Sequence, residues 1–229
     1  MTDRRRADYE PATFPAALAA FTGRYPGYTT TPAVDELRAA DYARLDHTGQ
    51  IYLDYTGGGL YADAQLRRHH DLLAANVFGN PHSQNPTSLA MTHLVEQARD
   101  YVLAFFNADP AEYTVVFTAN ASGALKLVGE SYPFAPGSRY ALTYDNHNSV
   151  NGIREFARAH GAAVRYIPVE LPDLRVPETS LLAALDDADP AADNLLAFPA
   201  QSNFSGVQHP LQWVEAAHAR GWDVLLDCA

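Results

Sequence analysis

The organisation of this chain follows from one stretch near its middle, residues 113–128, which reads Tyr113-Thr114-Val115-Val116-Phe117-Thr118-Ala119-Asn120-Ala121-Ser122-Gly123-Ala124-Leu125-Lys126-Leu127-Val128. Its first part is β-branched and aromatic, which predicts a buried strand at 113–118. Its last part has apolar residues at helical spacing, which predicts a helix at 121–131. The small residues between them leave backbone N–H groups accessible at the helix start, where a phosphate can bind. The alternative is an ordinary turn in which Asn or Ser caps the helix.

The remainder of the chain extends this pattern of short apolar strands and helices. Strands are expected at 113–118, 139–143, 163–167, 194–198 and 223–227, and helices at 121–131, 149–160, 178–187 and 211–220. Such alternation predicts an α/β fold, a mostly parallel sheet with helices on both faces. Before it we expect helices at 34–45, 61–76 and 87–106, a strand at 51–55 and an N-terminal arm. The predicted division is an arm with helices over 1–48 and a cofactor-binding domain over 49–229.

Composition restricts the possible partners. The net charge is −11 with only 16 basic residues, which argues against nucleic acid as the main partner. No apolar run approaches the roughly 20 residues of a membrane span, so no membrane partner is expected. A single cysteine argues against a disulfide framework and favours a cytoplasmic protein. His69 and His70 are adjacent and lack partners at ligand spacing, so no metal site is expected.

Polar residues follow several of the predicted strands. His147 comes after 139–143, Asn203 comes after 194–198, and Asp227 ends the last strand. Each has an ordinary explanation as a turn residue or a helix cap. In a parallel sheet, however, the carboxyl ends of the strands form one edge, where ligands bind. A phosphate site, an imidazole, an amide and a carboxylate at that edge suit pyridoxal 5′-phosphate, whose ring nitrogen requires a carboxylate partner.

Several motifs resemble those of one known family. They are Tyr52-Leu53-Asp54, Phe78-Gly79-Asn80-Pro81-His82-Ser83-Gln84-Asn85, Phe117-Thr118-Ala119, Ala124-Leu125-Lys126-Leu127-Val128, His147-Asn148-Ser149-Val150, Pro199-Ala200-Gln201-Ser202-Asn203-Phe204-Ser205-Gly206 and Leu225-Leu226-Asp227. From about residue 50 onward they resemble the class V aminotransferase fold. Within that fold the chain is most similar to the N-terminal domain of molybdenum cofactor sulfurases and to cysteine desulfurases.

The resemblance implies a pyridoxal phosphate enzyme that acts on an amino acid, with L-cysteine as the expected substrate and a homodimer as the expected assembly. It implies that His147 stacks on the pyridine ring, that Asn203 approaches the phenolic oxygen or the substrate carboxylate, and that Asp227 pairs with the ring nitrogen. It further implies that the phosphate is bound by Ala119, Asn120, Ala121 and Ser122. The edge of the substrate pocket would be formed by Asn80, His82 and Asn85.

The chain departs from the family pattern at the lysine that holds the cofactor as a Schiff base. In the family this lysine lies beyond the Asp that pairs with the ring, whereas here the only lysine is Lys126, inside the helix expected to hold the phosphate. We therefore expect the chain to be the front part of a longer protein. The lysine, the last strands, a small domain and a persulfide cysteine would then follow residue 229. Cys228 is expected to be a small packed residue whose thiolate is disfavoured beside Asp227.

Three alternatives stay open. The chain could be a catalytically inactive fragment or degenerate homologue. It could have another class V activity, as a transaminase, epimerase or lyase. A nicotinamide dinucleotide fold would fit the alternation of strands and helices, but residues 118–123 lack the three spaced glycines of its fingerprint.

Overall fold

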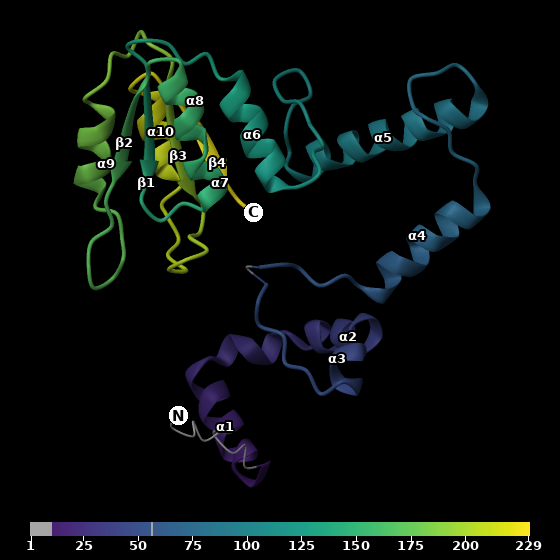
Figure 1. The fold of residues 1–229 in the computed structure, drawn as a ribbon. Helices are drawn as coiled ribbons and strands as arrows, with labels where there is room; N and C mark the ends of the chain where they lie inside the picture. The colour runs from purple at the N-terminus through teal and green to yellow at the C-terminus, as the bar shows by residue number, and fades with distance from the viewer. Residues whose placement is uncertain (1–10, 56) are drawn as a thin grey trace, which may run out of the picture. The chain divides into compact units, whose positions relative to one another are not determined.

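The computed structural model describes residues 11–55 and 57–229, and the chain forms two compact units that divide between Leu94 and Val95. The first unit is helical, and the second contains a sheet with helices on both faces (Figure 1). In the described part of the chain, no helix is both long and apolar enough to cross a bilayer.

The sheet of the second unit has four strands, all parallel, in the order β2-β1-β3-β4. The strands are β1 (Arg139–Thr143), β2 (Ala163–Ile167), β3 (Asn194–Pro199) and β4 (Trp222–Asp227). They confirm the α/β fold with a parallel sheet. The polar residues after β1, β3 and β4 therefore lie along one edge of the sheet.

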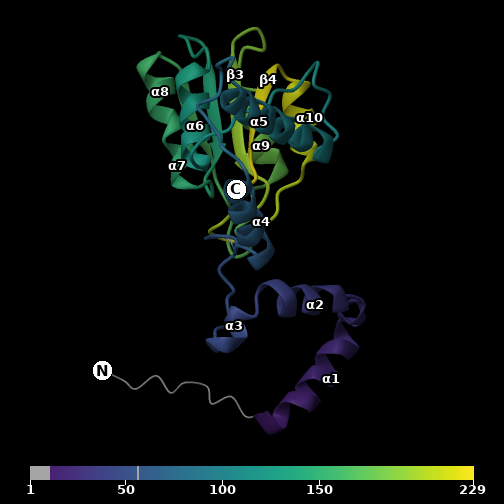
Figure 2. The same ribbon diagram turned by 90° about the vertical axis from the view of Figure 1, so that its right-hand side faces the viewer.

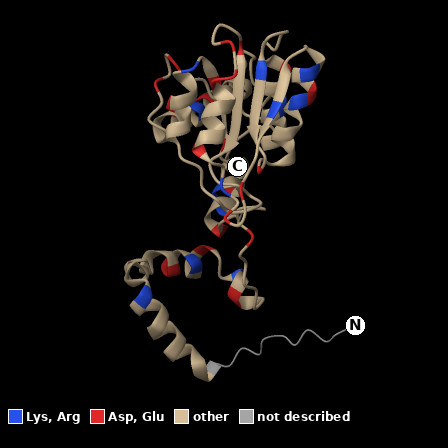
Figure 3. Cartoon of the chain, turned by 90° about the vertical axis from the view of Figure 1, so that its left-hand side faces the viewer, with Lys and Arg blue, Asp and Glu red and all other residues tan. Residues whose placement is uncertain are grey.

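A layer of helices covers each face of the sheet (Figure 2). One layer contains α6 (Ala121–Ser131), α7 (Asn148–Asn151) and α8 (Ile153–Ala159), and the other contains α9 (Glu178–Leu185) and α10 (Gln212–His218). Successive side chains of β1 alternate between them, since Tyr140 and Leu142 pack with the first layer and Ala141 with the second. The two inner strands, β1 and β3, are buried along almost their whole length, and Arg139 is the only charged residue in them. The edge strands are only half-buried and carry charges too, as the coloured segments in Figure 3 show.

Helix α6 approaches α8 closely at Gly129. A Cβ atom at Gly129 would lie 2.8 Å from Cδ2 of Phe156 and 3.4 Å from Cγ1 of Ile153. The absence of a side chain at this position therefore sets how near the two helices can come. Because the N-terminus of α6 belongs to the candidate site, this contact also fixes where that site lies.

Two of the predicted strands are wrong. Residues 113–118 and 51–55 form no strand, although both runs have strand composition. A strand exists only where a second strand completes its hydrogen-bond ladder, and none of the described residues pairs with either run. At 51–55 the hydroxyl of Tyr52 instead donates to the carbonyl oxygens of Asp54 and Gly58, so this segment closes on itself.

Several helices differ in detail from the prediction. The expected helix at 34–45 is divided into α2 (Pro32–Asp41) and α3 (Arg44–His47), and the one at 149–160 is interrupted at Gly152. The expected helix at 87–106 is α5 (Pro86–Phe105), but its predicted core face is wrong. Ala98 and Phe105 are exposed, and Ser88 is the only buried residue of this helix.

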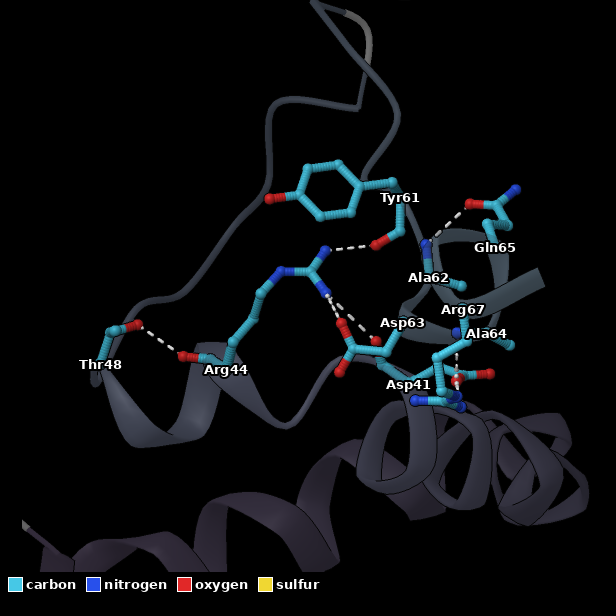
Figure 4. A network of polar contacts seen from close by, with 9 residues as sticks. All are labelled: Asp41, Arg44, Thr48, Tyr61, Ala62, Asp63, Ala64, Gln65 and Arg67. Carbon is cyan, nitrogen blue, oxygen red and sulfur yellow. Dashed lines mark hydrogen bonds and ion pairs between the residues drawn. The ribbon is translucent and has the colours of Figure 1, made fainter. Parts of the chain in front are cut away.

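The first unit further contains α1 (Phe14–Arg24) and α4 (Asp63–Ala75), and short 3₁₀ helices at Pro11–Thr13 and Pro26–Thr30. One arginine, Arg44, joins several of its segments (Figure 4). The guanidinium donates to the carboxylate of Asp63 at 3.0 Å and to the carbonyl oxygens of Asp41 and Tyr61. It also lies 4.3 Å from the centre of the Tyr61 ring. Arg44 thereby closes the loop between α3 and α4.

Candidate functional site

The N-terminus of α6 has both a cap and open donors. Asn120 is the N-cap, and its Oδ1 accepts from the N–H of Gly123 at 2.8 Å. Among residues 11–55 and 57–229, no acceptor reaches the N–H groups of Ala121 and Ser122. The structure confirms that Asn120 caps the helix. The two open N–H groups at the positive end of the helix dipole are compatible with a bound anion, and the phosphate site stays a prediction.

A pair of hydroxyl groups joins this helix to the loop after β1. Oγ of Ser122 lies 2.6 Å from Oγ of Ser149, which belongs to the first turn of α7. Ser149 is two residues beyond His147. The predicted phosphate residues and the predicted ring-covering histidine are therefore brought to the same corner of the sheet edge.

His147 has a defined hydrogen-bonding state. It is exposed, and its Nδ1 accepts from the N–H of Ser149 at 3.2 Å, which makes His147 the N-cap of α7. A nitrogen that accepts cannot carry a proton, so the neutral ring has its proton on Nε2. His147 can therefore offer an Nε2–H donor to a ligand, and protonation at Nδ1 would break the cap.

Asp227 lies farther along the same edge. It ends β4 beside Pro199 of β3, and β3 is paired on its other side with β1. With neighbouring strands about 4.8 Å apart, Asp227 lies roughly 10 Å from the end of β1 across the edge. Its Oδ1 accepts from the N–H of Ala229 at 3.0 Å. In the described part of the chain no donor reaches Oδ2, which leaves one carboxylate oxygen for a ligand.

Asn203 is in the loop that follows β3. The loop is closed by the bridge between Gln201 and Gln208 and turns at Gly206, whose φ of +73° suits glycine. Asn203 is exposed, and none of the described residues bonds its side-chain amide. It is therefore available to a ligand at the edge.

The second unit also contains the lysine and the cysteine considered in the sequence analysis, Lys126 and Cys228. Lys126 lies one turn after Ser122, pairs with Glu130 at 3.3 Å, and lines a hollow of about 240 Å³ together with Ser122 and Ser149. It is thus a neighbour of Ser122, one of the predicted phosphate residues. Cys228 is exposed, so the expectation of a packed thiol is wrong. Partial burial and the charge of Asp227 raise the pKa of this thiol, as expected.

The three predicted substrate-pocket residues lie in the first unit. Asn85 has a local role, because its Oδ1 accepts from the hydroxyl of Thr87 and from the N–H of Ser88 at the start of α5. His82 has a φ of +72°, and its N–H donates to the hydroxyl of Thr92. Asn80 is exposed. Their place at a substrate pocket stays a prediction.

Sequence reasoning missed two residues behind this edge. Asp145 and His209 form a buried pair, with Oδ2 of Asp145 3.0 Å from Nε2 of His209. Burial alone would raise the pKa of Asp145, but the hydrogen bond and charge of His209 outweigh it and leave this pKa lowered. The two residues are 64 positions apart, so no local motif could have joined them.

Comparison with known proteins identifies the family. The model of the aminotransferase class-V family matches residues 51–229, which is most of the chain. The chain belongs to the class V aminotransferase family. This confirms the resemblance drawn from the sequence motifs.

Several members of this family are close in sequence. A molybdenum cofactor sulfurase from Oryza sativa subsp. japonica is 40% identical over 93% of this chain, and one from Homo sapiens is 39% identical over 85%. The matches cover 29% and 23% of these two proteins. The chain therefore spans less than a third of the curated relatives that it matches.

Solved structures share the fold. A cysteine desulfurase from Thermococcus onnurineus NA1 matches with a TM-score of 0.72 and 23% identity, covering 85% of this chain and 47% of the other. One from Escherichia coli matches with a TM-score of 0.65 and 25% identity, covering 84% and 47%. Both confirm the predicted fold class.

Proposed function

We propose that this chain forms the cofactor-binding part of a pyridoxal 5′-phosphate enzyme that takes sulfur from L-cysteine, as the names molybdenum cofactor sulfurase and cysteine desulfurase describe. The observation that carries the proposal is the corner formed by α6 and α7. There, two open N–H groups and the hydroxyls of Ser122 and Ser149 adjoin the loop that bears His147. Membership of the family supports the cofactor, and the sulfurase relatives support the substrate.

The residues of the edge fit the cofactor. A phosphate dianion suits the N-terminus of α6, because Ala121 and Ser122 supply uncommitted donors together with the helix dipole. The free Oδ2 of Asp227 suits a protonated pyridine nitrogen. When bound, the cofactor would supply an electron sink for negative charge that develops on the substrate carbon.

The side chains of the chain itself would have three separate tasks. Asp227 holds a proton at the ring nitrogen by its negative charge, which keeps the ring electron-poor. His147 covers the ring and offers Nε2–H as a donor, since its Nδ1 is occupied by the N–H of Ser149. Asn203 provides an amide at the phenolic oxygen or at the substrate carboxylate.

The proposed reaction breaks the bond between Cβ and Sγ of L-cysteine. Cβ gains a proton and the product is L-alanine, while the sulfur atom is transferred to an acceptor thiol, which becomes a persulfide. Cys228 is not proposed as this acceptor, because its raised pKa disfavours the thiolate that would attack sulfur.

A second reading, cofactor binding without turnover, is favoured by the position of Lys126. It is the only lysine, and it lies beside the phosphate end of the site, paired with Glu130. A group so placed can add positive charge near a phosphate. We expect the 229-residue chain alone to bind pyridoxal phosphate, and we expect turnover from a longer protein that includes this chain and supplies a lysine.

Product analysis tests the reaction. A protein that contains this chain is incubated with pyridoxal phosphate, L-cysteine and a thiol reductant, and L-alanine and sulfide are measured. Equal amounts of the two support the proposal. Sulfide with pyruvate would indicate a lyase, and amino transfer to an oxo acid would indicate a transaminase. A racemised product would indicate an epimerase.

Three further features belong to the proposal. We expect a homodimer, as the family resemblance implies, and light scattering of the purified protein would test it. We expect a cytoplasmic location, which the single cysteine supports. Asn80, His82 and Asn85 remain proposed neighbours of the substrate, and alanine variants that raise KM for L-cysteine would support that role.

A further inference from the structure

The pair of Asp145 and His209 is buried among aromatic side chains. Both side chains are 2% exposed. The His209 ring is stacked on Trp213 at 5.0 Å between centroids and lies edge-on to Phe198 at 6.3 Å. Burying a carboxylate in such surroundings costs free energy unless it is paired, and the proposed chemistry uses neither group directly.

The loop at 200–209 binds the main chain of Asp145 as well as its carboxylate. Oγ of Ser202 donates to the carbonyl oxygen of Asp145 at 3.0 Å. Next to it, Nδ2 of Asn146 donates to the carbonyl oxygen of Ala197 in β3 at 3.1 Å. Three hydrogen bonds therefore join the loop after β1 to β3 and the loop that follows it.

These two loops carry the proposed ligand groups. The loop at 144–149 bears His147 two residues after Asp145, and the loop at 200–209 bears Asn203 next to Ser202. Oγ of Ser202 also accepts from the N–H of Phe204 and from that of Ser205, so it shapes the turn around Asn203. A displacement of Asp145 would therefore move both the loop that carries His147 and the loop that carries Asn203.

We propose that Asp145 and His209 are positioning residues that hold the His147 loop and the Asn203 loop in a fixed relation at the sheet edge. The relevance of this role to catalysis rests on the proposed function. The pair acts through the loops and does not touch a ligand, because both side chains are almost completely enclosed.

The test measures amide hydrogen exchange of the cofactor-free chain. His209→Phe retains an aromatic ring against Trp213 but removes the bond to Asp145. We expect exchange at 144–149 and at 200–209 to become about tenfold faster or more, with the amides of β1 and α9 unchanged. In His209→Gln the side-chain amide can take the place of Nε2, so we expect exchange within about threefold of the wild type.

A spectroscopic readout separates positioning from general stability. In the wild type, ¹⁵N spectra should show His147 with its proton on Nε2. In His209→Phe, the Nδ1 resonance should move toward the average of the two tautomers, because the loop no longer holds the N–H of Ser149 against it. Asp186→Asn is the matched control, since it removes the exposed pair with Arg220 without touching either loop. It should leave the spectrum unchanged.

Two outcomes would overturn the proposal. One is faster exchange throughout the second unit, which would indicate loss of stability alone. The other is an effect confined to 200–209, which would show that the two loops are not coupled. If His209→Phe does not fold, the double variant Asp145→Leu with His209→Phe removes the buried charge as well. Fast exchange in both loops supports positioning, and slow exchange in either refutes it.

The affinity for pyridoxal phosphate distinguishes this inference from the proposed function. If the wild type binds the cofactor, His209→Phe should weaken binding by about tenfold and His209→Gln should restore it. If the wild type does not bind it, the proposed function fails. The exchange and tautomer measurements then still decide whether the pair positions the two loops.

Discussion

Replacement of Ala121 by proline would remove one proposed phosphate donor with little change to the fold. Ala121 is the first residue of α6, and no described residue accepts from its N–H. Proline is favoured at the first position of a helix, where the N–H has no partner within the helix. The preceding Asn120 is extended, with φ −169° and ψ 173°, as a residue before proline prefers.

The magnitude follows from the single hydrogen bond lost. A hydrogen bond to a charged group contributes about 1.5–3 kcal/mol, so the Kd of pyridoxal phosphate should rise roughly 10- to 150-fold. The free energy of unfolding should stay equal or increase by about 0.4–1 kcal/mol, because proline restricts the unfolded chain. Binding of pyridoxal, which has no phosphate, should not change.

Isothermal titration and chemical denaturation would measure the two quantities on the same variants. The matched control is Ala124→Pro, one turn further on, where the N–H donates to the carbonyl oxygen of Asn120 at 3.2 Å. That variant should lose about 3 kcal/mol of stability. If Ala121→Pro binds pyridoxal phosphate as tightly as the wild type, the phosphate does not lie at the start of α6.

Three other predictions concern the sheet and its edge. Gly129→Ala should lower the free energy of unfolding by about 0 to 2 kcal/mol. Overpacking against Phe156 costs about 1–3 kcal/mol, and the higher helix propensity of alanine offsets about 1 kcal/mol of this. In denaturant titrations the control Gly123→Ala, whose Cβ would be 3.6 Å from its nearest neighbours, should be neutral or stabilising, and the reverse order would contradict the packing described here. The pKa of Asp145 in the folded protein is lowered from its ordinary value of 3.8. Ionised Asp145 therefore contributes fully to the free energy of unfolding above pH 3.8, and this contribution is lost as the pH falls through the folded pKa. The stability difference between the wild type and Asp145→Asn should therefore be constant near neutral pH and shrink below about pH 4, and a difference that does not shrink would exclude Asp145 as the source. In an active protein that contains this chain, Asp227→Ala should lower kcat for L-cysteine much more than Ser122→Ala, because it removes ring protonation and not one contact among several. Similar losses from both would contradict the assigned roles.

The parallel sheet was predictable because each of its strands can be recognised from its own residues. Residues 139–143 and 163–167 are short apolar runs with turn residues around them, and the structure has strands at those positions. Residues 113–118, which are β-branched and aromatic, form no strand. The composition of a segment indicates that it could form a strand. Whether it does depends on a second strand that completes the hydrogen bonds, and the segment itself does not specify that strand.

The candidate site was predictable where it depends on strand ends and helix starts. The positions of His147 and Asp227 at one edge follow from the parallel order of the strands, because every strand in such a sheet ends on the same side. Ser122 follows no strand, and its place beside the His147 loop is shown by its contact with Ser149. The pair of Asp145 and His209 could not be found in this way. Its two residues come from different loops, and only the folded sheet brings them to 3.0 Å.

Asn85 shows a further limit of reading a polar loop. A loop rich in Asn, His and Ser is compatible with turn chemistry and with a binding surface. The structure establishes the first for Asn85, whose side chain caps the start of α5. A short polar side chain that caps a helix and one that binds a ligand look the same in sequence.

The central claim is tested most directly by a crystal structure of this protein with pyridoxal phosphate bound. The account predicts phosphate oxygens within hydrogen-bond distance of the N–H groups of Ala121 and Ser122. The ring should lie against His147, with its nitrogen facing Oδ2 of Asp227. A phosphate bound away from α6, or a ring nitrogen that does not reach Asp227, would contradict the account.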